Sequence, residues 1–188
     1  IHLTCHQRGR PEWDAALSAF VPSADLPKAL LVAGAANGQM TTAAAIQDAV
    51  TSAMKITEDY GRKPTSVAIP KTSDESASIT PFWYVSGTER GWVDQQNDVT
   101  VKDIKLAHQE NFRSVEHLKR YTTLGMATDQ GKTSNVLGLA IMAHTAGQSI
   151  PDTGTTIYRP PYSPTAIGVL AGRSRDMDFR PIRKTPSH

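Results

Sequence analysis

The first residues with chemical potential form a run of small side chains at positions 32–38 (VAGAANG), ahead of an alanine-rich segment that begins at Thr41. Small residues let a backbone approach a pyrophosphate or a ribose closely, and the N-terminus of a helix attracts an anion. The run lacks the full G-x-G-x-x-G pattern, so the residues alone favour an ordinary tight turn between a strand and a helix.

A second candidate is the stretch from Gly131 to Ser134, whose Gly131-Lys132-Thr133 resembles the end of a phosphate-binding P-loop. Five residues separate Gly125 from Gly131, one more than that loop allows, and no strand precedes it, so we reject the P-loop interpretation. Lys132 and the hydroxyl groups of Thr133 and Ser134 still suit an anion at the start of a helix. A capped helix start with a solvated lysine explains the spacing equally well.

A third candidate, a metal site, is made of His2, Cys5 and His6. On a strand the two histidines share one face and the cysteine points to the other, so the three side chains do not converge and we predict no metal site. The single cysteine permits no internal disulfide, which fits a reducing compartment. We find no catalytic triad and no paired carboxylates, so we assign no catalytic residue.

The elements around the first candidate resemble half of a nucleotide-binding unit. Residues 1–7 alternate as in a strand, residues 29–33 are apolar as in a buried parallel strand, and residues 41–54 predict a helix. A short amphipathic run covers 13–20. Two prolines and several hydroxyl residues over 61–80 indicate a linker.

The second candidate lies in a helical region. Thr100 and Asp103 resemble a capping box at the start of one helix. A second helix is predicted over 114–121, ending near Gly125 as a C′ glycine. A third, capped by Ser134, is predicted over 134–147.

Composition excludes several classes of protein. The chain has 188 residues and a net charge of +2, which does not point to nucleic acid. It has no apolar stretch of about 20 residues that would span a membrane, and no signal peptide is visible. Because the chain begins with Ile1, we expect a fragment or one piece of a larger subunit.

Beyond these patterns, most of the chain resembles the alpha subunit of heterotetrameric sarcosine oxidase. The resemblance rests on residues 93–104 (VDQQNDVTVKDI), 114–135 (SVEHLKRYTTLGMATDQGKTSN), 155–168 (TTIYRPPYSPTAIG), 13–17 (WDAAL) and 32–36 (VAGAA). The later region also resembles the small bacterioferritin-associated-ferredoxin-like domain of related opine and amine oxidoreductases.

That ferredoxin-like domain holds a [2Fe–2S] cluster through four cysteines. The corresponding positions here are Asp94, Gln96, Asp129 and Ser134. Because such a cluster needs thiolate ligands, the resemblance implies a scaffold without an Fe–S cluster, whose loop is held by its own packing or by a new ligand.

The resemblance implies an α+β fold: the C-terminal part of a Rossmann-like dinucleotide-binding domain followed by a small helical module and extended linkers. We expect the dinucleotide-binding part at 1–60, a linker at 61–87, the helical ferredoxin-like module at 88–150 and an extended linker at 151–188. The main dinucleotide fingerprint is expected before Ile1 and a folate-binding domain after His188.

The resemblance also implies a bacterial, cytoplasmic enzyme with beta, gamma and delta subunits as partners. Such an enzyme demethylates sarcosine with oxygen, forming glycine, hydrogen peroxide and 5,10-methylenetetrahydrofolate. FAD and covalently held FMN belong to the beta subunit, while the alpha subunit binds NAD and packs near FMN. This chain would hold cofactors and would not be catalytic alone.

Site residues carried over by position fall into two groups. The residues expected to line NAD are Ala35, Met40 and Thr42. The residues expected to face FMN are Arg120, Thr122, Gln130, Lys132, Thr133 and Ser134.

Two alternatives belong to other functional classes. One is a non-catalytic scaffold or linker module of a related opine or amine oxidoreductase. The other is a ferredoxin-like electron carrier, against which the missing cysteines argue.

Overall fold

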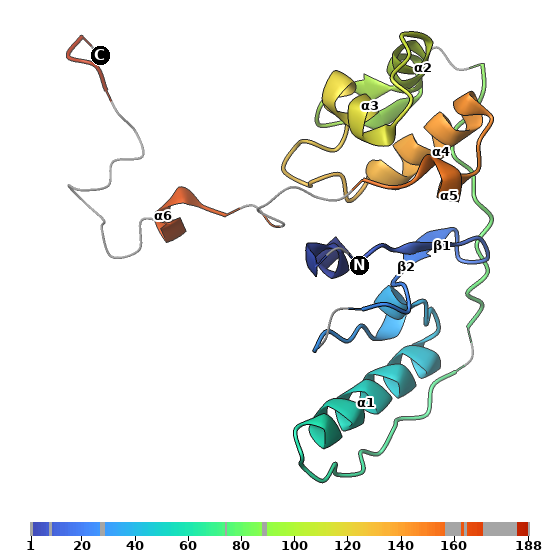
Figure 1. Ribbon diagram of the computed structural model, residues 1–188, viewed down its shortest axis with the longest axis vertical. Coiled ribbons are helices and arrows are strands. Elements are labelled where there is room, and N and C mark those ends of the chain that lie inside the picture. Colours follow the sequence, from blue (N-terminus) through green and yellow to red (C-terminus); the bar gives the residue numbers. More distant parts are fainter. Residues whose placement is uncertain are drawn as a thin grey trace.

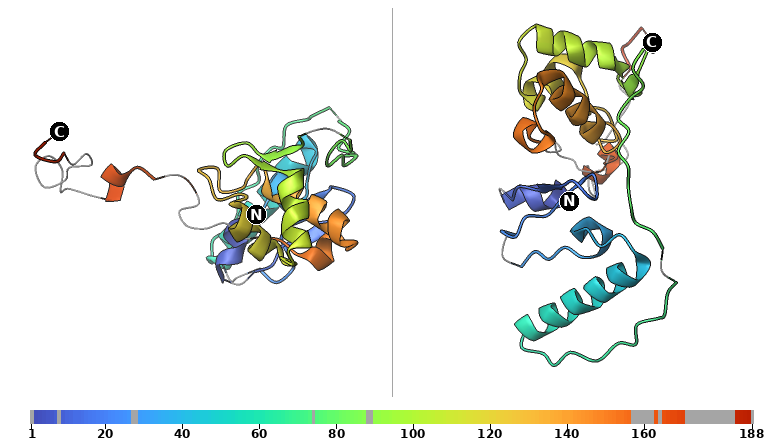
Figure 2. Two further views of the ribbon diagram at one scale, coloured as in Figure 1. Left: turned by 90° about the horizontal axis from the view of Figure 1, so that it is seen from above. Right: turned by 90° about the vertical axis from the view of Figure 1, so that its right-hand side faces the viewer.

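The computed structural model describes residues 2–7, 9–26, 29–73, 75–87, 90–156, 163, 165–170 and 184–187. The fold mixes helices with two short antiparallel hairpins, in keeping with the expected helix-and-strand class. A long helix lies at one end of the long axis and a cluster of helices at the other, with one hairpin between them (Figures 1 and 2). None of the helices within the described ranges combines the length and apolarity needed to cross a membrane.

Residues 90–156, which include the cluster of helices at one end of the molecule, are called here the helical module. It contains β3 (Trp92–Asp94), β4 (Val99–Thr100), α2 (Val101–Gln109), α3 (Val115–Thr122), α4 (Asn135–Ala146) and α5 (Ile150–Thr153). The two strands pair antiparallel with an irregular register, and the chain passes directly from β4 into α2. Figure 1 shows α2, α3 and α4 grouped together at this end of the molecule.

The core of the helical module is centred on α4. This helix is apolar on nearly all sides, a pattern that requires burial on all sides. Its buried residues include Leu139, Ile141 and Met142, which pack with residues of α2 and α3 such as Ile104 and Leu118. Each such side chain stabilises the fold by about 1.5–3 kcal/mol when fully buried. The buried residues of α4 are therefore a main source of the stability of the helical module.

Two helix starts confirm the predictions. The Thr100 hydroxyl accepts from the Asp103 N–H and the Asp103 carboxylate accepts from the Thr100 N–H at 2.7 Å, which completes a capping box. Ser114 accepts from the N–H of His117 at 3.2 Å. Gly147 ends α4 in the left-handed region, with φ 64°.

Two details of these predictions are wrong. The α3 helix ends at Thr122, and its left-handed C-cap is Thr123 at φ 62°, two residues before Gly125, which is itself left-handed at φ 66°. The side chain of Ser134 does not cap α4, because its backbone is already close to helical and its hydroxyl has no hydrogen-bond partner among the described residues. The cap was predicted from residue type, but an N-cap needs an extended backbone for its oxygen to reach the next turn.

The N-terminal part contains η1 (His2–Gln7), β1 (Glu12–Asp14), β2 (Ala19–Val21), η2 (Gly34–Asn37) and α1 (Thr42–Asp59). The amphipathic run over 13–20 is a hairpin, closed by Asp14, which accepts from the N–H groups of Ala16 and Leu17. Trp13 packs edge-on against Phe20 with 5.0 Å between ring centroids.

Two strand predictions in this part are wrong. Residues 2–7 form a 3₁₀-helix, and residues 29–33 form no strand. An extended apolar segment becomes a strand only where a neighbour pairs with its backbone, and the described residues provide none beside 29–33. Without that strand the Rossmann-like arrangement stays a prediction.

The helix predicted over 41–54 is confirmed as α1, which continues to Asp59. The described residues over 61–80 have no regular structure, and their role as a linker stays a prediction. The linker runs as an extended segment along one side of the molecule (Figure 1). A short helix, α6 (Ile167–Leu170), is described beyond residue 156, whereas the segment 157–162 lies outside the described residues, as do the side chains of His2 and His6.

Candidate functional site

The first candidate site is the turn that leads into α1. Residues 34–37 form η2, which is one turn of 3₁₀-helix. Gly38 closes it at φ 81°, and the Gly38 N–H donates a hydrogen bond to the carbonyl oxygen of Ala35 at 3.1 Å. Ala35 is exposed and Met40 is half-buried. Thr42 is exposed as the first residue of α1. The three residues predicted to line NAD therefore lie within one turn and the helix start after it.

Two carboxylates that sequence reasoning missed shape this turn. Asp48 reaches back from α1, accepting from the Gly34 N–H at 2.9 Å and from the Asn37 amide at 3.2 Å. Glu75, from the linker, accepts from the N–H of Thr42. The hydroxyl and N–H of Thr42 lower the pKa of Glu75 below its ordinary value. The sequence gives no sign of either carboxylate's role, because each hydrogen bond joins residues that lie 14 or 33 positions apart in the chain.

The second candidate site is the segment from Thr123 to Ser134, called here the 123–134 loop. Just before it, Arg120 is exposed and pairs with Glu116 at 3.5 Å on the surface of α3. The Thr122 hydroxyl donates to the carbonyl oxygen of Leu118 at 2.8 Å. Both predicted residues thus lie on the last turn of α3, where the chain enters the loop.

Asp129 organises the second half of this loop. It accepts from the Gly131 N–H at 3.1 Å and from the Thr133 hydroxyl at 2.7 Å, and its carbonyl oxygen accepts from the Lys132 ammonium at 3.2 Å. Burial alone would raise the pKa of Asp129, but the bonds from Thr133 and Gly131 and the charge of Lys132 outweigh it and lower that pKa. Lys132 and Thr133, predicted as anion ligands, are therefore arranged around a carboxylate.

Gln130 and Ser134 differ in exposure. Gln130 is half-buried, with φ 54°, and its amide donates to the carbonyl oxygen of Ala127 at 3.2 Å. Ser134 is 1% exposed, and its hydroxyl group has no partner among the described residues. The side chain after it, Asn135, is also buried and donates weakly to the Gln130 carbonyl oxygen at 3.5 Å.

The turn between β3 and β4 lies against the 123–134 loop. The hydroxyl of Thr128 donates to Gln96 at 2.8 Å, and the amide of Asn97 donates to the carbonyl oxygen of Thr123 at 2.8 Å. A third contact runs from the N–H of Gly125 to Asp94 at 2.7 Å. The two segments that carry the four cysteine-replacing positions are thus adjacent.

The two groups of predicted site residues are not brought together. The turn at 34–42 lies beside α1 and the 123–134 loop lies in the helical module, at the other end of the molecule (Figures 1 and 2). Among the described residues no three His, Cys, Asp or Glu side chains gather as a metal site would require.

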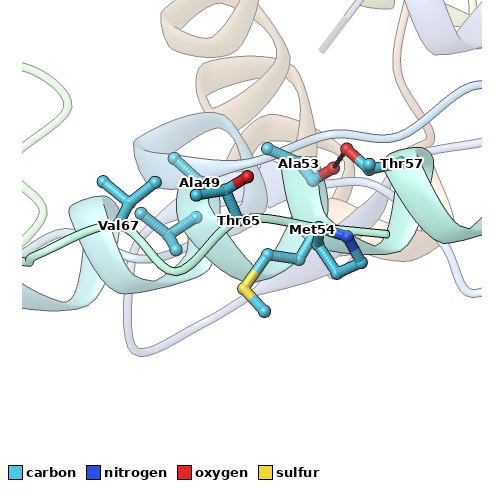
Figure 3. A pocket seen from close by; sticks show the side chains of 8 residues that line it. Ala49, Ala53, Met54, Thr57, Thr65 and Val67 are labelled. Atoms are coloured by element: carbon cyan, nitrogen blue, oxygen red, sulfur yellow. Dashed lines mark hydrogen bonds between the residues drawn. The ribbon is translucent and has the colours of Figure 1, made fainter. Parts of the chain in front are cut away.

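A groove of about 310 Å³ lies between α1 and the linker, away from both predicted sites. Figure 3 shows Met54 and Ala53 of α1 beside Thr65 and Val67 of the linker. Its remaining lining residues are Ala49, Val50, Thr57 and Pro64. Because no charged side chain lines it, the groove offers shape and apolar contact but no group for acid–base chemistry.

Comparisons with known proteins cover the whole chain. Residues 88–173 match the family model described as the sarcosine oxidase A3 domain. The chain is 42% identical over 191 residues to the sarcosine oxidase subunit alpha of Rhizobium meliloti (strain 1021), covering 100% of this chain and 19% of that protein. It is 36% identical over 202 residues to the sarcosine oxidase subunit alpha of Corynebacterium sp. (strain P-1), covering 100% of this chain and 20% of that protein.

A crystal structure of L-proline dehydrogenase from P. horikoshii has a similar fold, with a TM-score of 0.62 and 17% identity over 87% of this chain and 35% of that one. At that identity the likeness concerns the fold alone. The chain spans about a fifth of the length of the curated relatives it matches. With its identity to them extending from end to end, the chain matches a segment of a sarcosine oxidase alpha subunit.

Proposed function

We propose that this chain is a cofactor-holding segment of a multisubunit sarcosine oxidase. The proposed enzyme is cytoplasmic and bacterial, and demethylates sarcosine with oxygen to give glycine, hydrogen peroxide and 5,10-methylenetetrahydrofolate. It comprises beta, gamma and delta subunits, with FAD in the beta subunit. The observation that carries the proposal is the 42% identity to a sarcosine oxidase alpha subunit over the entire chain.

The 123–134 loop is the part proposed to border FMN, whose isoalloxazine ring would supply the redox chemistry. Two exposed cationic residues, Arg120 and Lys132, lie at the two ends of the stretch that would face it. Asp129 already accepts hydrogen bonds from the hydroxyl and the N–H of Thr133. The phosphate would therefore be bound mainly through the positive charges of Arg120 and Lys132. The residues fit an FMN phosphate at the rim of the loop rather than one enclosed by it.

The turn at 34–42 is the part proposed to contact NAD. The exposed Ala35 leaves room for close approach, and Asp48 holds the turn in shape through Gly34 and Asn37. Glu75 already takes the Thr42 N–H, and a second anion there would be repelled. We therefore propose that Thr42 and its surroundings meet a ribose, whose hydroxyl groups can donate to a carboxylate, rather than the pyrophosphate.

The domain division expected from the sequence is kept as part of the proposal. Residues 1–60 would complete a dinucleotide-binding domain, 61–87 and 151–188 would act as linkers, and 88–150 would form the flavin-facing module. The module is proposed to hold no Fe–S cluster, because Asp94, Gln96, Asp129 and Ser134 offer no thiolate. Iron analysis of the purified complex tests this: about two iron atoms per alpha subunit, as a [2Fe–2S] cluster requires, would contradict it.

The test of the flavin proposal is Lys132→Ala in the complete alpha subunit, assembled with its partners. We expect less FMN to be incorporated covalently into the complex, because its phosphate is held less well before attachment, and unchanged FAD. Lys102→Ala is the matched control, since Lys102 is exposed on α2 and should leave both flavins unchanged. Unchanged FMN in the Lys132→Ala complex would refute the proposed FMN border.

The nicotinamide proposal is tested by placing a large side chain at the start of α1. Thr42→Trp should abolish NAD binding, measured by equilibrium dialysis of the complex. Thr51→Trp, an exposed position further along the same helix, should leave it unchanged. Equal NAD binding by both variants would overturn the assignment of the 34–42 turn.

A non-catalytic scaffold, in a related opine or amine oxidoreductase, is the second candidate. It is favoured by the hydrogen bonds within the 123–134 loop, where Asp129 already accepts from the donors of Gly131 and Thr133 that an anion would otherwise use. A scaffold would tolerate both Lys132→Ala and Thr42→Trp without loss of any cofactor, so the same experiments separate it from the first candidate.

A further inference from the structure

Asp94 makes hydrogen bonds in two directions. One carboxylate oxygen, Oδ1, accepts from the N–H groups of Gln96 and Asn97 at 2.9 and 3.2 Å and so closes the turn after β3. The other, Oδ2, accepts from the N–H of Gly125 at 2.7 Å. Asp94 is 3% exposed. A carboxylate that deep in the fold is retained at a cost in desolvation, so its hydrogen bonds decide the local structure.

The β1–β2 hairpin supplies an internal comparison. Asp14 ends β1 as Asp94 ends β3, and its Oδ1 atom accepts from the N–H groups two and three residues later, at 2.9 and 3.0 Å. Both turns also contain a left-handed residue, Ser18 at φ 49° and Asp98 at φ 54°. Within the described residues Asp14 bonds only inside its own turn. The bond to a distant loop is therefore an addition at Asp94 and not part of the hairpin itself.

The place where Asp94 reaches the loop is tightly constrained. Gly125 is buried at φ 66°, and a Cβ there would collide with the side chain of Asn135. Two neighbouring contacts, Gln96 with Thr128 and Asn97 with the carbonyl of Thr123, hold the same stretch from the same turn. The bond from Gly125 is the one of the three that is buried.

We propose that Asp94 is a positioning residue: through Gly125 it sets the conformation of the 123–134 loop and thereby the placement of Lys132. The inference rests on the proposed function, in which this loop borders FMN. Asp94 itself contacts no cofactor in this proposal and acts through the backbone of the loop.

The decisive variant is Asp94→Asn in the assembled complex. The amide has one accepting oxygen, so whichever way it turns, an NH₂ group faces N–H donors either in its own turn or at Gly125. Asp14→Asn is the matched control, because a turned amide can still accept from both donors of its own turn. Hydrogen exchange measured by mass spectrometry over peptides spanning 123–134, together with FMN content, gives the two readouts.

We expect Asp94→Asn to accelerate exchange in the 123–134 loop by about tenfold or more, in line with the loss of a hydrogen bond to a charged group, and to lower the amount of FMN incorporated. Exchange in the buried centre of α4 should change less, and Asp14→Asn should alter neither readout. If loop exchange and FMN content both match the parent complex, or if only loop exchange changes, Asp94 is not a positioning residue.

Two further variants keep the test decisive. Should Asp94→Asn unfold the module, seen as fast exchange throughout α4, Gln96→Ala replaces it, since Gln96 is exposed and its loss removes only the bond to Thr128. Faster loop exchange with less FMN incorporated then supports the role of the turn, and no change overturns it. If Lys132→Ala leaves FMN unchanged, the proposed function fails; if Lys132→Ala lowers FMN and the turn variants do not, only this inference fails.

Discussion

Gly131→Ala is expected to destabilise the helical module strongly, because two independent penalties meet at this position. Gly131 is buried and has φ 72°, a conformation that costs an L-residue about 1–2 kcal/mol. A Cβ there would also collide with the carboxamide of Asn135, which lies between Gly131 and Gly125. Overpacking of this kind costs about 1–3 kcal/mol, and the reduced entropy of the unfolded chain offsets about 0.4–1 kcal/mol.

The expected loss is therefore about 1–5 kcal/mol, the sum of the strain and the steric clash less the entropic offset. Hydrogen exchange of the buried α4 amides, from Leu139 to Met142, reports the opening free energy of the module. About 1.4 kcal/mol corresponds to a tenfold faster exchange. Gly147→Ala is the matched control, since Gly147 has φ 64° but nothing within 4 Å of a Cβ.

Removing the Asn135 carboxamide tests the steric penalty by itself. In an Asn135→Ala background the collision with the carboxamide is absent, so Gly131→Ala should then cost about as much as Gly147→Ala, less than about 2 kcal/mol. Equal losses from Gly131→Ala with and without Asn135 would show that the carboxamide does not fill the space beside Gly131.

Three other outcomes follow from the helix starts and from Asp129. Thr100→Ala should cost the module about 1 kcal/mol in urea denaturation, since it removes one side of a capping box; an unchanged midpoint would contradict this. Ser134→Ala should cost less than about 0.5 kcal/mol, because the buried hydroxyl has no partner among the described residues; a loss as large as that of Thr100→Ala would reveal a cap at Ser134. Because the pKa of Asp129 is lowered in the fold, its contribution is complete above the ordinary value of 3.8 and is lost as the pH falls below it through the lowered pKa. Protection of the 123–134 loop from exchange should therefore fall with acidification in the parent and much less in Asp129→Asn, and identical pH profiles would exclude Asp129 as the cause.

Local patterns were sufficient for several helix boundaries. The capping box at Thr100, the cap at Ser114 and the glycine at 147 were all predicted, because each depends on bonds within about four residues. Ser134 had the same residue type, yet its nearly helical backbone leaves the hydroxyl without a role as a cap. The resemblance to sarcosine oxidase alpha subunits was likewise present in the residues themselves and agrees with the comparisons.

Tertiary structure decided the rest. Whether 29–33 becomes a strand depends on a pairing neighbour, and whether 13–20 becomes a hairpin depends on β1 and β2 meeting across four turn residues. The contacts that shape the two candidate sites join Asp48 to Gly34 and Asp94 to Gly125, across 14 and 31 positions. No periodicity records such contacts, because a carboxylate chooses among N–H groups only after packing has brought them within reach. The sequence by itself thus determined the resemblance to sarcosine oxidase alpha subunits, four of the helices (α1 to α4) and the chemical types at the two candidate sites, while the tertiary structure alone decided which backbone groups those side chains hold.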